Sequence, residues 1–305
     1  MITRAQALIF LEPGLSEIWN EKYPRHEAQY VKWVNLVDLN KATMTTTRMT
    51  DFGPLRLKGE AEALTQDDPI FGGTKTFQPL RFGLKYGISQ EMIDHDLYGQ
   101  ASTLEQGLMK SAIEFQETLA ANVWNGAFGT TNADGYSATG FDGLALCSTA
   151  HTRLDGGAVI ANRPASDADL GVASLQAAVI AFENMKDERG RPSRIVPKTL
   201  VISPEDIFTA EELLGSEYKP GTANNEINAV RKYGLTYTVS HYKTDTDAWF
   251  LVASPSDTGI KFIWDVRPRG ETWEDKDKEV IFRKVVLGCF VGHDSFRGVY
   301  GTSGS

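Results

Sequence analysis

The segment from Ser174 to Ser216, SLQAAVIAFENMKDERGRPSRIVPKTLVISPEDIFTAEELLGS, carries the clearest succession of structural signals in the chain. Its first part has apolar residues spaced three and four apart, which is the period of an amphipathic helix. This helix is predicted to begin in the region of Asp167 and Asp169. The members of its buried stripe are Leu175, Val179, Phe182 and Met185.

The second part of the segment predicts a turn, a strand and another helix. Gly190 and Pro192, in DERGRP, are typical of the end of a helix. The apolar run from Thr199 to Ile202 predicts a short buried strand. Ser203-Pro204 follows as a helix cap with proline in the first helical position. Helix, strand and helix in such close order indicate a small α/β module.

Strand patterns follow this module. LTYTVSHY (235–242) and DAWFLVAS (247–254) predict two strands joined by the turn KTDTD. IKFIWDVRPRG (260–270) and EVIFRKVVLGCF (279–290) predict a final pair, which needs a sheet elsewhere in the molecule. The charged residues from Glu271 to Glu279 predict a solvated hairpin tip. Four aromatic residues at strand spacing are predicted to be core residues: Trp249, Phe250, Phe262 and Trp264.

Two further elements precede the module. Ser102 and Glu105 suggest a capping box, and Asn125-Gly126 a stop, for a helix of roughly 34 Å. The apolar positions of this helix are Leu104, Leu108, Ala112, Phe115, Leu119 and Val123. From Asp51 to Tyr86 the chain is rich in Gly and Pro and alternates locally, which predicts a β-ribbon that cannot bury both faces by itself.

Composition excludes several classes of protein. The 305 residues carry 31 Lys and Arg against 40 Asp and Glu, a net charge of −9, which argues against tight phosphate binding. Two cysteines, Cys147 and Cys289, provide no disulfide framework. No apolar stretch approaches the ~20 residues of a membrane span, and the N-terminus lacks the pattern of a signal peptide. We therefore expect a soluble protein made in a reducing cytosol.

No established catalytic motif occurs in the chain. Cys147, His151 and Asp155 are spaced i, i+4 and i+8, but their loop-like surroundings favour a structural role over a thiol–imidazole pair. Asp94-His95-Asp96 suggests helix capping or a solvated cluster rather than a metal site. Asp245 and Asp247 fit a turn better than a calcium loop. We expect no catalytic, cofactor or metal site.

The order of these pieces resembles a known family. KYGISQEMIDHDLYG leads into STLEQGLMKSAIEFQETLAANVWNG, and FDGLALCSTAHTRLDGG and NRPASDADL come before the module. TANNEIN and DAWFLVAS come after it. The chain is similar to tailed-phage major capsid proteins of the HK97 type, in particular the group of Mu-like major head subunits. The resemblance covers roughly residues 84–300 and rests on the order of the motifs.

This resemblance implies an α+β fold with five parts. They are an N-terminal arm (1–47), an extended E-loop ribbon (48–88), a P domain (89–165) with a spine helix at about 101–126, an α/β A-domain (166–259), and C-terminal strands of the P domain (260–305). The final strands would complete a sheet begun before the A-domain. Asp294, Arg297 and the glycines near Tyr300 would lie at the edge of that sheet.

The function implied is that of a structural protein and not an enzyme. Such a subunit self-assembles through pentamers and hexamers into an icosahedral shell, which encloses double-stranded DNA without recognising its sequence. The expected partners are a separate scaffolding protein, a portal, and head-completion or decoration proteins, with no membrane. The expected location is the virion, after synthesis in the cytoplasm of a bacterial host. An encapsulin-like nanocompartment and a cysteine hydrolase using Cys147 and His151 remain as alternatives.

The resemblance also assigns roles to individual residues. Asn224, Asn225 and Glu226 become candidates for contacts between subunits near the capsomer axis, while Phe115 and Leu119 become core residues. A covalent cross-link would use Lys58 or Lys75, and we do not expect one. Six apolar ribbon residues are predicted to be buried mainly on a neighbouring subunit: Leu55, Leu57, Ile70, Phe71, Phe77 and Leu80.

Overall fold

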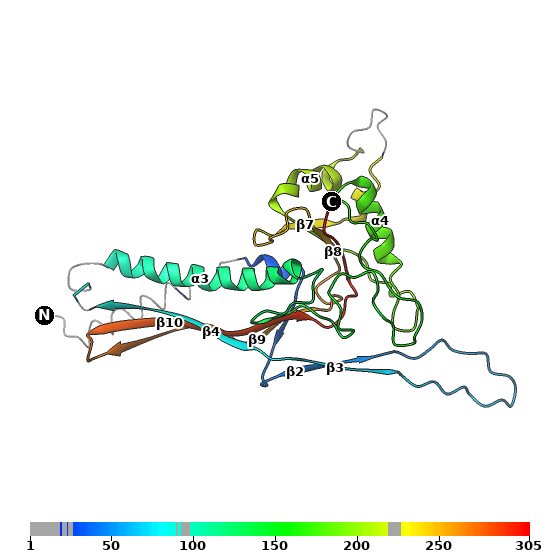
Figure 1. The fold of residues 1–305 in the computed structure, drawn as a ribbon, viewed down its shortest axis with the longest axis horizontal. Coiled ribbons are helices and arrows are strands. Elements are labelled where there is room, and N and C mark those ends of the chain that lie inside the picture. The colour runs from blue at the N-terminus through cyan, green and yellow to red at the C-terminus, as the bar shows by residue number, and fades with distance from the viewer. Residues whose placement is uncertain (1–18, 20–22, 24–26, 90, 93–97, 219–226) are drawn as a thin grey trace.

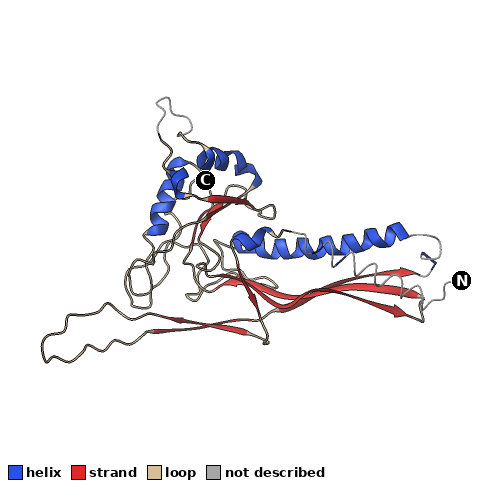
Figure 2. Cartoon of the chain, turned by 180° about the vertical axis from the view of Figure 1, so that it is seen from behind, coloured by secondary structure: helices blue, strands red, loops and turns tan. Residues whose placement is uncertain are grey.

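The computed structural model describes residues 19, 23, 27–89, 91–92, 98–218 and 227–305. It has three visible parts (Figure 1). A long helix lies along one face of an extended sheet, a smaller α/β part rises beside it, and a narrow ribbon projects beyond both. Viewed from behind, the ribbon has short strands near its base and loop beyond them (Figure 2).

The extended sheet joins strands from both ends of the chain. Its order is β1 (Asn35–Asp38), β9 (Ile260–Asp275), β10 (Val280–His293) and β4 (Leu80–Ser89), and β5 (Tyr136–Ser137) also pairs with β10. β1 runs parallel to β9, whereas β10 runs antiparallel to both β9 and β4. This confirms that the pair of strands after residue 260 completes a sheet begun near the N-terminus.

The predicted long helix is α3 (Tyr98–Asn125), which covers the extended sheet. Leu108, Leu119 and Val123 are buried as expected, because their spacing places them on the face toward the sheet. Leu104 is exposed, and Phe115 is only partly buried. The predicted capping box is wrong. The helix begins before Ser102, and Glu105 is fully buried against the sheet instead of capping the helix.

The smaller part is a four-stranded sheet with helices. Its order is β11 (Val299–Thr302), β8 (Trp249–Val252), β6 (Thr199–Ile202) and β7 (Thr236–Val239). Its helical segments are α4 (Val172–Glu183), α5 (Ile207–Gly215) and the short 3-10 turns η3 (Pro204–Asp206) and η4 (Val230–Tyr233). The predicted stripe on α4 and the predicted strand at 199–202 are both buried. β7 and β8 do not form a hairpin, because β6 lies between them.

Strand β11 corrects the prediction for the C-terminus. We expected all strands of 260–305 in the first sheet, but β11 pairs with β8 in the second. All four of its residues are buried. Gly301 explains this close packing, since a Cβ atom there would lie 2.4 Å from the Phe250 ring. The absence of a side chain at Gly301 lets β11 pack closely against Phe250 of β8, within the α/β part.

The ribbon differs from the predicted range of 48–88 at both ends. It consists of β2 (Met44–Met49) paired antiparallel with β3 (Phe71–Phe77), so it begins earlier and ends earlier than expected. β4 belongs to the extended sheet, because ten of its residues pair with β10. Ile88 of β4 is buried there.

The last part of the predicted arm of residues 1–47 packs into the core of its own subunit. Tyr30, in the 3-10 turn η2 (Gln29–Lys32), and Trp33 and Val34, directly after it, lie in the main hydrophobic cluster. The Tyr30 ring stacks on Phe262 at 4.8 Å, and the Trp33 ring lies 4.6 Å from Trp124. Large aromatic side chains gain much free energy when their apolar surface is removed from water, which explains why this stretch forms part of the core.

Two predictions for the later strands hold. Trp249, Phe250, Phe262 and Trp264 are all core residues. The turn after β9 is exposed over residues 276–279, as expected for a solvated hairpin tip, although β9 itself continues as far as Asp275.

Candidate assembly surfaces

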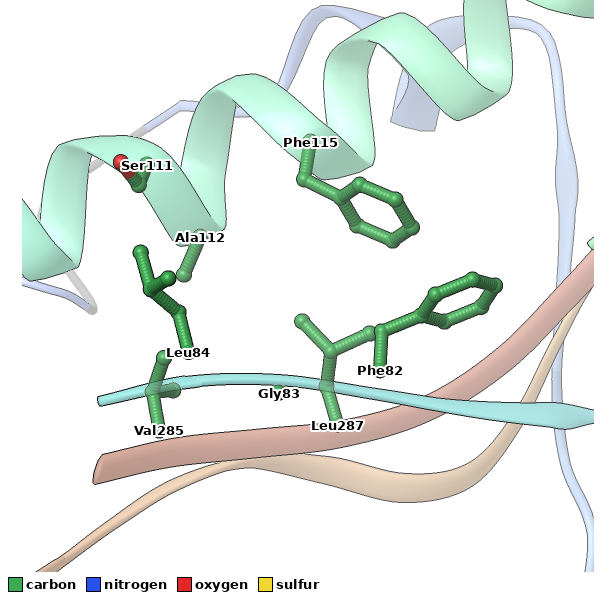
Figure 3. Close-up of a pocket in the computed structure, with 8 residues that line it drawn as sticks. All are labelled: Phe82, Gly83, Leu84, Ser111, Ala112, Phe115, Val285 and Leu287. Carbon is green, nitrogen blue, oxygen red and sulfur yellow. The ribbon is translucent and has the colours of Figure 1, made fainter.

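An apolar groove lies between α3 and the extended sheet (Figure 3). Phe115 points down from the helix toward Phe82 and Leu287 on the strands, and Ala112 faces Leu84. The rings of Phe82 and Phe115 are 4.6 Å apart. The groove has a volume of about 290 Å³ and is also lined by Ser111, Gly83 and Val285.

The groove is lined in part by β4, the outermost strand of the extended sheet. β4 is the last strand in the order, so its outer backbone groups have no neighbouring strand within the described part of the subunit. Leu84 of β4 is 53% exposed. Unpaired strand edges beside exposed apolar side chains are typical places for association with another chain. This edge is therefore a candidate receptor surface.

A buried ion pair fixes the helix above the groove. The Arg283 guanidinium of β10 donates to the Glu105 carboxylate of α3 at 3.0 Å, and the Tyr86 hydroxyl donates to the same carboxylate at 3.0 Å. Burial and the neighbouring Glu105 carboxylate raise the pKa of Tyr86 above its ordinary value. Gly270 leaves room for the guanidinium, since a Cβ atom there would lie 2.5 Å from it.

The ribbon presents apolar residues to solvent. Leu55 and Leu57 are completely exposed, and Leu64 is 81% exposed. Ile70 and Phe71 of the ribbon, and Leu80 at the start of β4, are also exposed in the single subunit. Monomeric soluble proteins rarely leave contiguous apolar surface in water, so the ribbon is a second candidate surface for association.

The base of the ribbon is anchored, which corrects the prediction that Phe77 is buried by a neighbour. Phe77 is fully buried within its own subunit and lies 6.0 Å from the Phe290 ring. Lys75 donates to the backbone carbonyl of His293 at 3.0 Å. Burial lowers the pKa of Lys75 to about 8, although the carboxylates of Asp294 and Asp142 act in the opposite direction. Lys58, the other candidate for a cross-link, is exposed.

The predicted contacts at Asn224, Asn225 and Glu226 lie outside the described residues. The chain on either side of them is held together by a bridge between Tyr218 and Ile227. Asn228 is buried and donates to the carbonyls of Leu213 and Ser216. Tyr218, Ile227 and Phe208 are exposed nearby in the chain, so this end of the α/β part also carries apolar surface.

Cys147 and His151 do not form a nucleophile–base pair. Nδ1 of His151 lies 2.6 Å from Asp142, and Nε2 lies 3.0 Å from Asn162, so both ring nitrogens already have partners. Burial raises the pKa of the Cys147 thiol, which opposes formation of a thiolate. Asp155 pairs with Arg153. His151 stacks on Phe296 at 3.7 Å and joins three loops instead.

The other candidate metal-site residues either form a turn or lie outside the described residues. Asp94, His95 and Asp96 are not among the described residues. Asp245 forms the predicted turn, accepting from the backbone N–H groups of Asp247 and Ala248. Within the described ranges, no group of three or more His, Cys, Asp or Glu side chains is placed to hold a metal ion. No helix in the described part is long and apolar enough to cross a membrane.

Asp294 and Arg297 lie between β10 and β11 and join distant segments. Asp294 pairs with Lys261 of β9. Arg297 donates to Glu188 at 2.8 Å and to the carbonyl of Lys186 at 2.9 Å. The sequence placed these residues at a sheet edge but gave no sign of their partners, because the partners are far away in the chain.

Comparison with solved structures confirms the predicted α+β architecture of the HK97 type. The procapsid protein of bacteriophage JBD30 matches with a TM-score of 0.55 at 13% identity, over 99% of this chain and 76% of that one. The mature capsid protein of bacteriophage PhiM1 matches with a TM-score of 0.58 at 10% identity, over 90% and 86%. The SrpI encapsulin of Synechococcus elongatus PCC 7942 matches with a TM-score of 0.52 at 10% identity, over 89% and 85%.

At identities of 10–13%, these structural matches establish likeness of fold alone, and the family follows from the sequence comparison. No curated protein matches the chain by sequence. The family described as "Phage capsid protein", however, matches residues 73–301, which is well over half of the chain. The predicted subgroup of Mu-like head subunits stays a prediction. With this sequence match and the capsid fold together, the chain belongs to the family of phage capsid proteins.

Proposed function

We propose that this chain is a major capsid subunit that assembles through pentamers and hexamers into an icosahedral shell around double-stranded DNA. The family match and the capsid fold support this proposal. The observation that carries it is the exposure of Leu55, Leu57 and Leu64 on a ribbon that projects away from the rest of the subunit. A single subunit leaves these side chains in water, and a neighbouring copy would bury them.

The groove under α3 is the surface on which that ribbon would dock. Every subunit carries both the ribbon and the groove, and they are different patches. Contact between unlike patches of identical subunits builds closed rings when the rotation closes. The leucines of one ribbon would enter the groove beside Phe82 and Phe115 of the next subunit, along the free edge of β4.

The family match and the capsid fold also suggest names for the parts of the subunit. The ribbon of residues 44–77 corresponds to the E-loop. The extended sheet with α3 corresponds to the P domain. The α/β part, residues 166–259 together with β11, corresponds to the A-domain. The N-terminal arm would be the part of the chain before Tyr30, most of which lies outside the described residues. These assignments rest on the order of elements and on sheet pairing.

The proposed setting is the virion, after synthesis in the cytoplasm of a bacterial host. A net charge of −9 suits a wall that encloses DNA without binding it tightly. A scaffolding protein, a portal, and head-completion or decoration proteins are the further partners of such a shell. The occupied nitrogens of His151 and the raised pKa of Cys147 support a purely structural role without catalysis.

A second candidate is the shell of a protein nanocompartment. The likeness to the SrpI encapsulin favours it as an alternative, since the same fold there belongs to an encapsulin complex. The two functions differ in their contents. Particles purified from cells that hold nuclease-protected double-stranded DNA support the phage shell. Particles that hold a protein cargo and no DNA support the nanocompartment.

Paired substitutions on the ribbon test the docking step. Leu55→Ser with Leu57→Ser removes apolar surface, whereas Arg56→Ser with Lys58→Ser alters the charged residues that follow each leucine and serves as the control. We expect the first pair to abolish closed shells in electron micrographs while thermal unfolding of the subunit is unchanged. We expect the second pair to assemble. Normal shells from the leucine variant would refute the ribbon as a contact between subunits.

Deletion of the ribbon tip gives a second test. Replacing the whole of residues 56–78 would also remove Phe77 from the core. A deletion of residues 54–66, bridged by a short Gly-Ser linker, leaves both β2 and β3 intact. It should preserve cooperative unfolding by circular dichroism and leave monomers or isolated rings. A deletion variant that still closes shells would contradict the proposal.

A further inference from the structure

The turn after α4, residues 187–191, is built as a rigid support. Oδ1 of Asp187 accepts hydrogen bonds of 2.8 Å from the backbone N–H groups of both Arg189 and Arg191. The Asp187 N–H donates to the Arg191 carbonyl at 2.7 Å. Gly190 has a φ of +77°, which favours glycine. The turn therefore holds Glu188, Arg189 and Arg191 in fixed positions.

Glu188 fastens the base of the ribbon to this turn. Its carboxylate accepts from Arg48 of β2 at 3.0 Å, from Arg297 at 2.8 Å, and from the N–H of Leu154 at 3.1 Å. All three charged side chains are 14% exposed or less. Burial alone would raise the pKa of Glu188, but the hydrogen bonds of Arg48 and the charge of Arg297 hold it below its ordinary value. The carboxylate stays charged in its bonded site.

Arg189 and Arg191 reach further out and contact both sides of the ribbon. Arg189 donates to Thr50 at 3.2 Å on one side, and on the other to the carboxylate of Asp67 at 3.0 Å and the carbonyl of Asp68 at 2.6 Å. Arg191 donates to the carbonyl of Phe52 at 2.8 Å. The two guanidinium groups thus join segments that pass each other in opposite directions.

These contacts occur where the ribbon has lost its own backbone ladder. The Thr50 N–H donates to the Ile70 carbonyl at 3.0 Å. Beyond it, among residues 51–69, all of which the structure describes, one backbone hydrogen bond remains, from the Glu62 N–H to the Gly59 carbonyl at 3.3 Å in the tip turn. Two-stranded ribbons are marginal in water even with a complete ladder. Here the side chains of Arg189 and Arg191 join the two sides of the ribbon in place of backbone hydrogen bonds.

We infer that the 187–191 turn is a latch that sets the direction of the ribbon tip within the subunit, before any neighbour binds. A ribbon held in one direction loses less conformational entropy on association than a free one, so the latch favours assembly without touching the neighbour. The direction of the tip is a property of the single subunit. Only the consequence for assembly rests on the proposed function.

A distance measurement between two spin labels tests the latch on unassembled full-length subunits. Labels at Glu60→Cys on the ribbon tip and Glu212→Cys on α5 occupy exposed sites, while the native Cys147 and Cys289 are buried. We expect one narrow distance distribution in the parent protein. Arg189→Ala with Arg191→Ala should broaden it at least twofold, and Glu188→Gln should broaden it as well.

Glu183→Gln is the matched control, because it removes an exposed negative charge from the end of α4 without touching the ribbon. It should leave the distribution unchanged. The latch is overturned if the parent distribution is already broad, or if the arginine variant stays as narrow as the parent. Thermal unfolding checks that each variant is folded. If the arginine variant does not fold, Glu188→Gln provides the test of the latch. Because the labels report on single subunits, a failed latch and a failed shell assembly are separate results.

Discussion

Glu105 of α3 and Arg283 of β10 form an ion pair that is almost completely buried, although 178 residues separate them in the chain. Arg283 also donates to Thr272 at 2.9 Å, and Tyr86 donates to Glu105, so the charges are surrounded by hydrogen bonds. The pair joins the long helix to β10, a strand close to the C-terminal end of the sequence. Because α3 and β10 both line the groove, the ion pair also fixes the position of the helix over the groove.

The pair predicts an asymmetric response to substitution. Arg283→Met leaves the Glu105 carboxylate buried without its partner and should lower the free energy of unfolding by about 3–5 kcal/mol. Adding Glu105→Gln should restore part of that loss, because the unpaired charge is removed. Arg267→Met, at the exposed pair with Asp38, is the control and should cost about 0–1 kcal/mol. Urea unfolding of the four proteins measures these differences, and equal losses at both sites would contradict the account.

Two apolar residues of α3 should respond differently to truncation. Leu119 is fully packed, so Leu119→Ala should destabilise the subunit by about 2–5 kcal/mol. Phe115 is only partly buried and lines the open groove, so Phe115→Ala should cost less stability than Leu119→Ala and impair assembly more. Urea unfolding and electron microscopy of both variants measure the two effects. The reverse order would show that Phe115 belongs to the core and not to a contact surface.

Lys75 predicts a rise in stability with pH. Its pKa falls from an ordinary 10.5 to about 8 in the folded protein, chiefly through burial. The unfolded chain therefore binds more protons between pH 8 and 10.5, and in this window the free energy of unfolding increases with pH. Lys75→Met removes that contribution. Other groups, including Lys243, titrate in both proteins and cancel in the difference.

The stability of the parent relative to Lys75→Met should thus be lowest below pH 8 and should improve toward pH 10. Urea unfolding at pH 7, 8, 9 and 10 measures this difference directly. A constant difference across the series would mean that the amine of Lys75 keeps its ordinary pKa in the folded subunit.

The two thiols should be inert in the folded protein. Burial raises the pKa of Cys147, and it raises the pKa of Cys289 to about 12, so neither forms a thiolate near neutral pH. A disulfide reagent at pH 8 should label no cysteine in the native subunit and both cysteines in urea. Cys147→Ala should still form shells. Rapid native labelling of Cys147 would reopen the hypothesis of a cysteine hydrolase.

The sequence determined the elements whose signals are local. The stripe of α4 is buried as its spacing predicts, since residues three and four apart share one face of a helix. The strand at Thr199–Ile202, the turn at Asp245 and the hairpin of β9 with β10 also follow from neighbouring residues. The order of these elements was enough to indicate the capsid fold, because it is the succession of elements that the chain shares with its family.

Only the tertiary structure decided which partners these elements meet. Glu105 has the spacing of a helix cap and is instead the buried partner of Arg283, because the N-terminus of α3 lies further upstream than Ser102. β4 alternates like the ribbon before it, yet it joins β10. Glu188 lies in a turn that the sequence marks clearly, but its contacts with Arg48 and Arg297 cross more than a hundred residues. Periodicity fixes which face of an element is apolar, whereas pairing depends on which surfaces the folded chain brings within a few ångströms of each other.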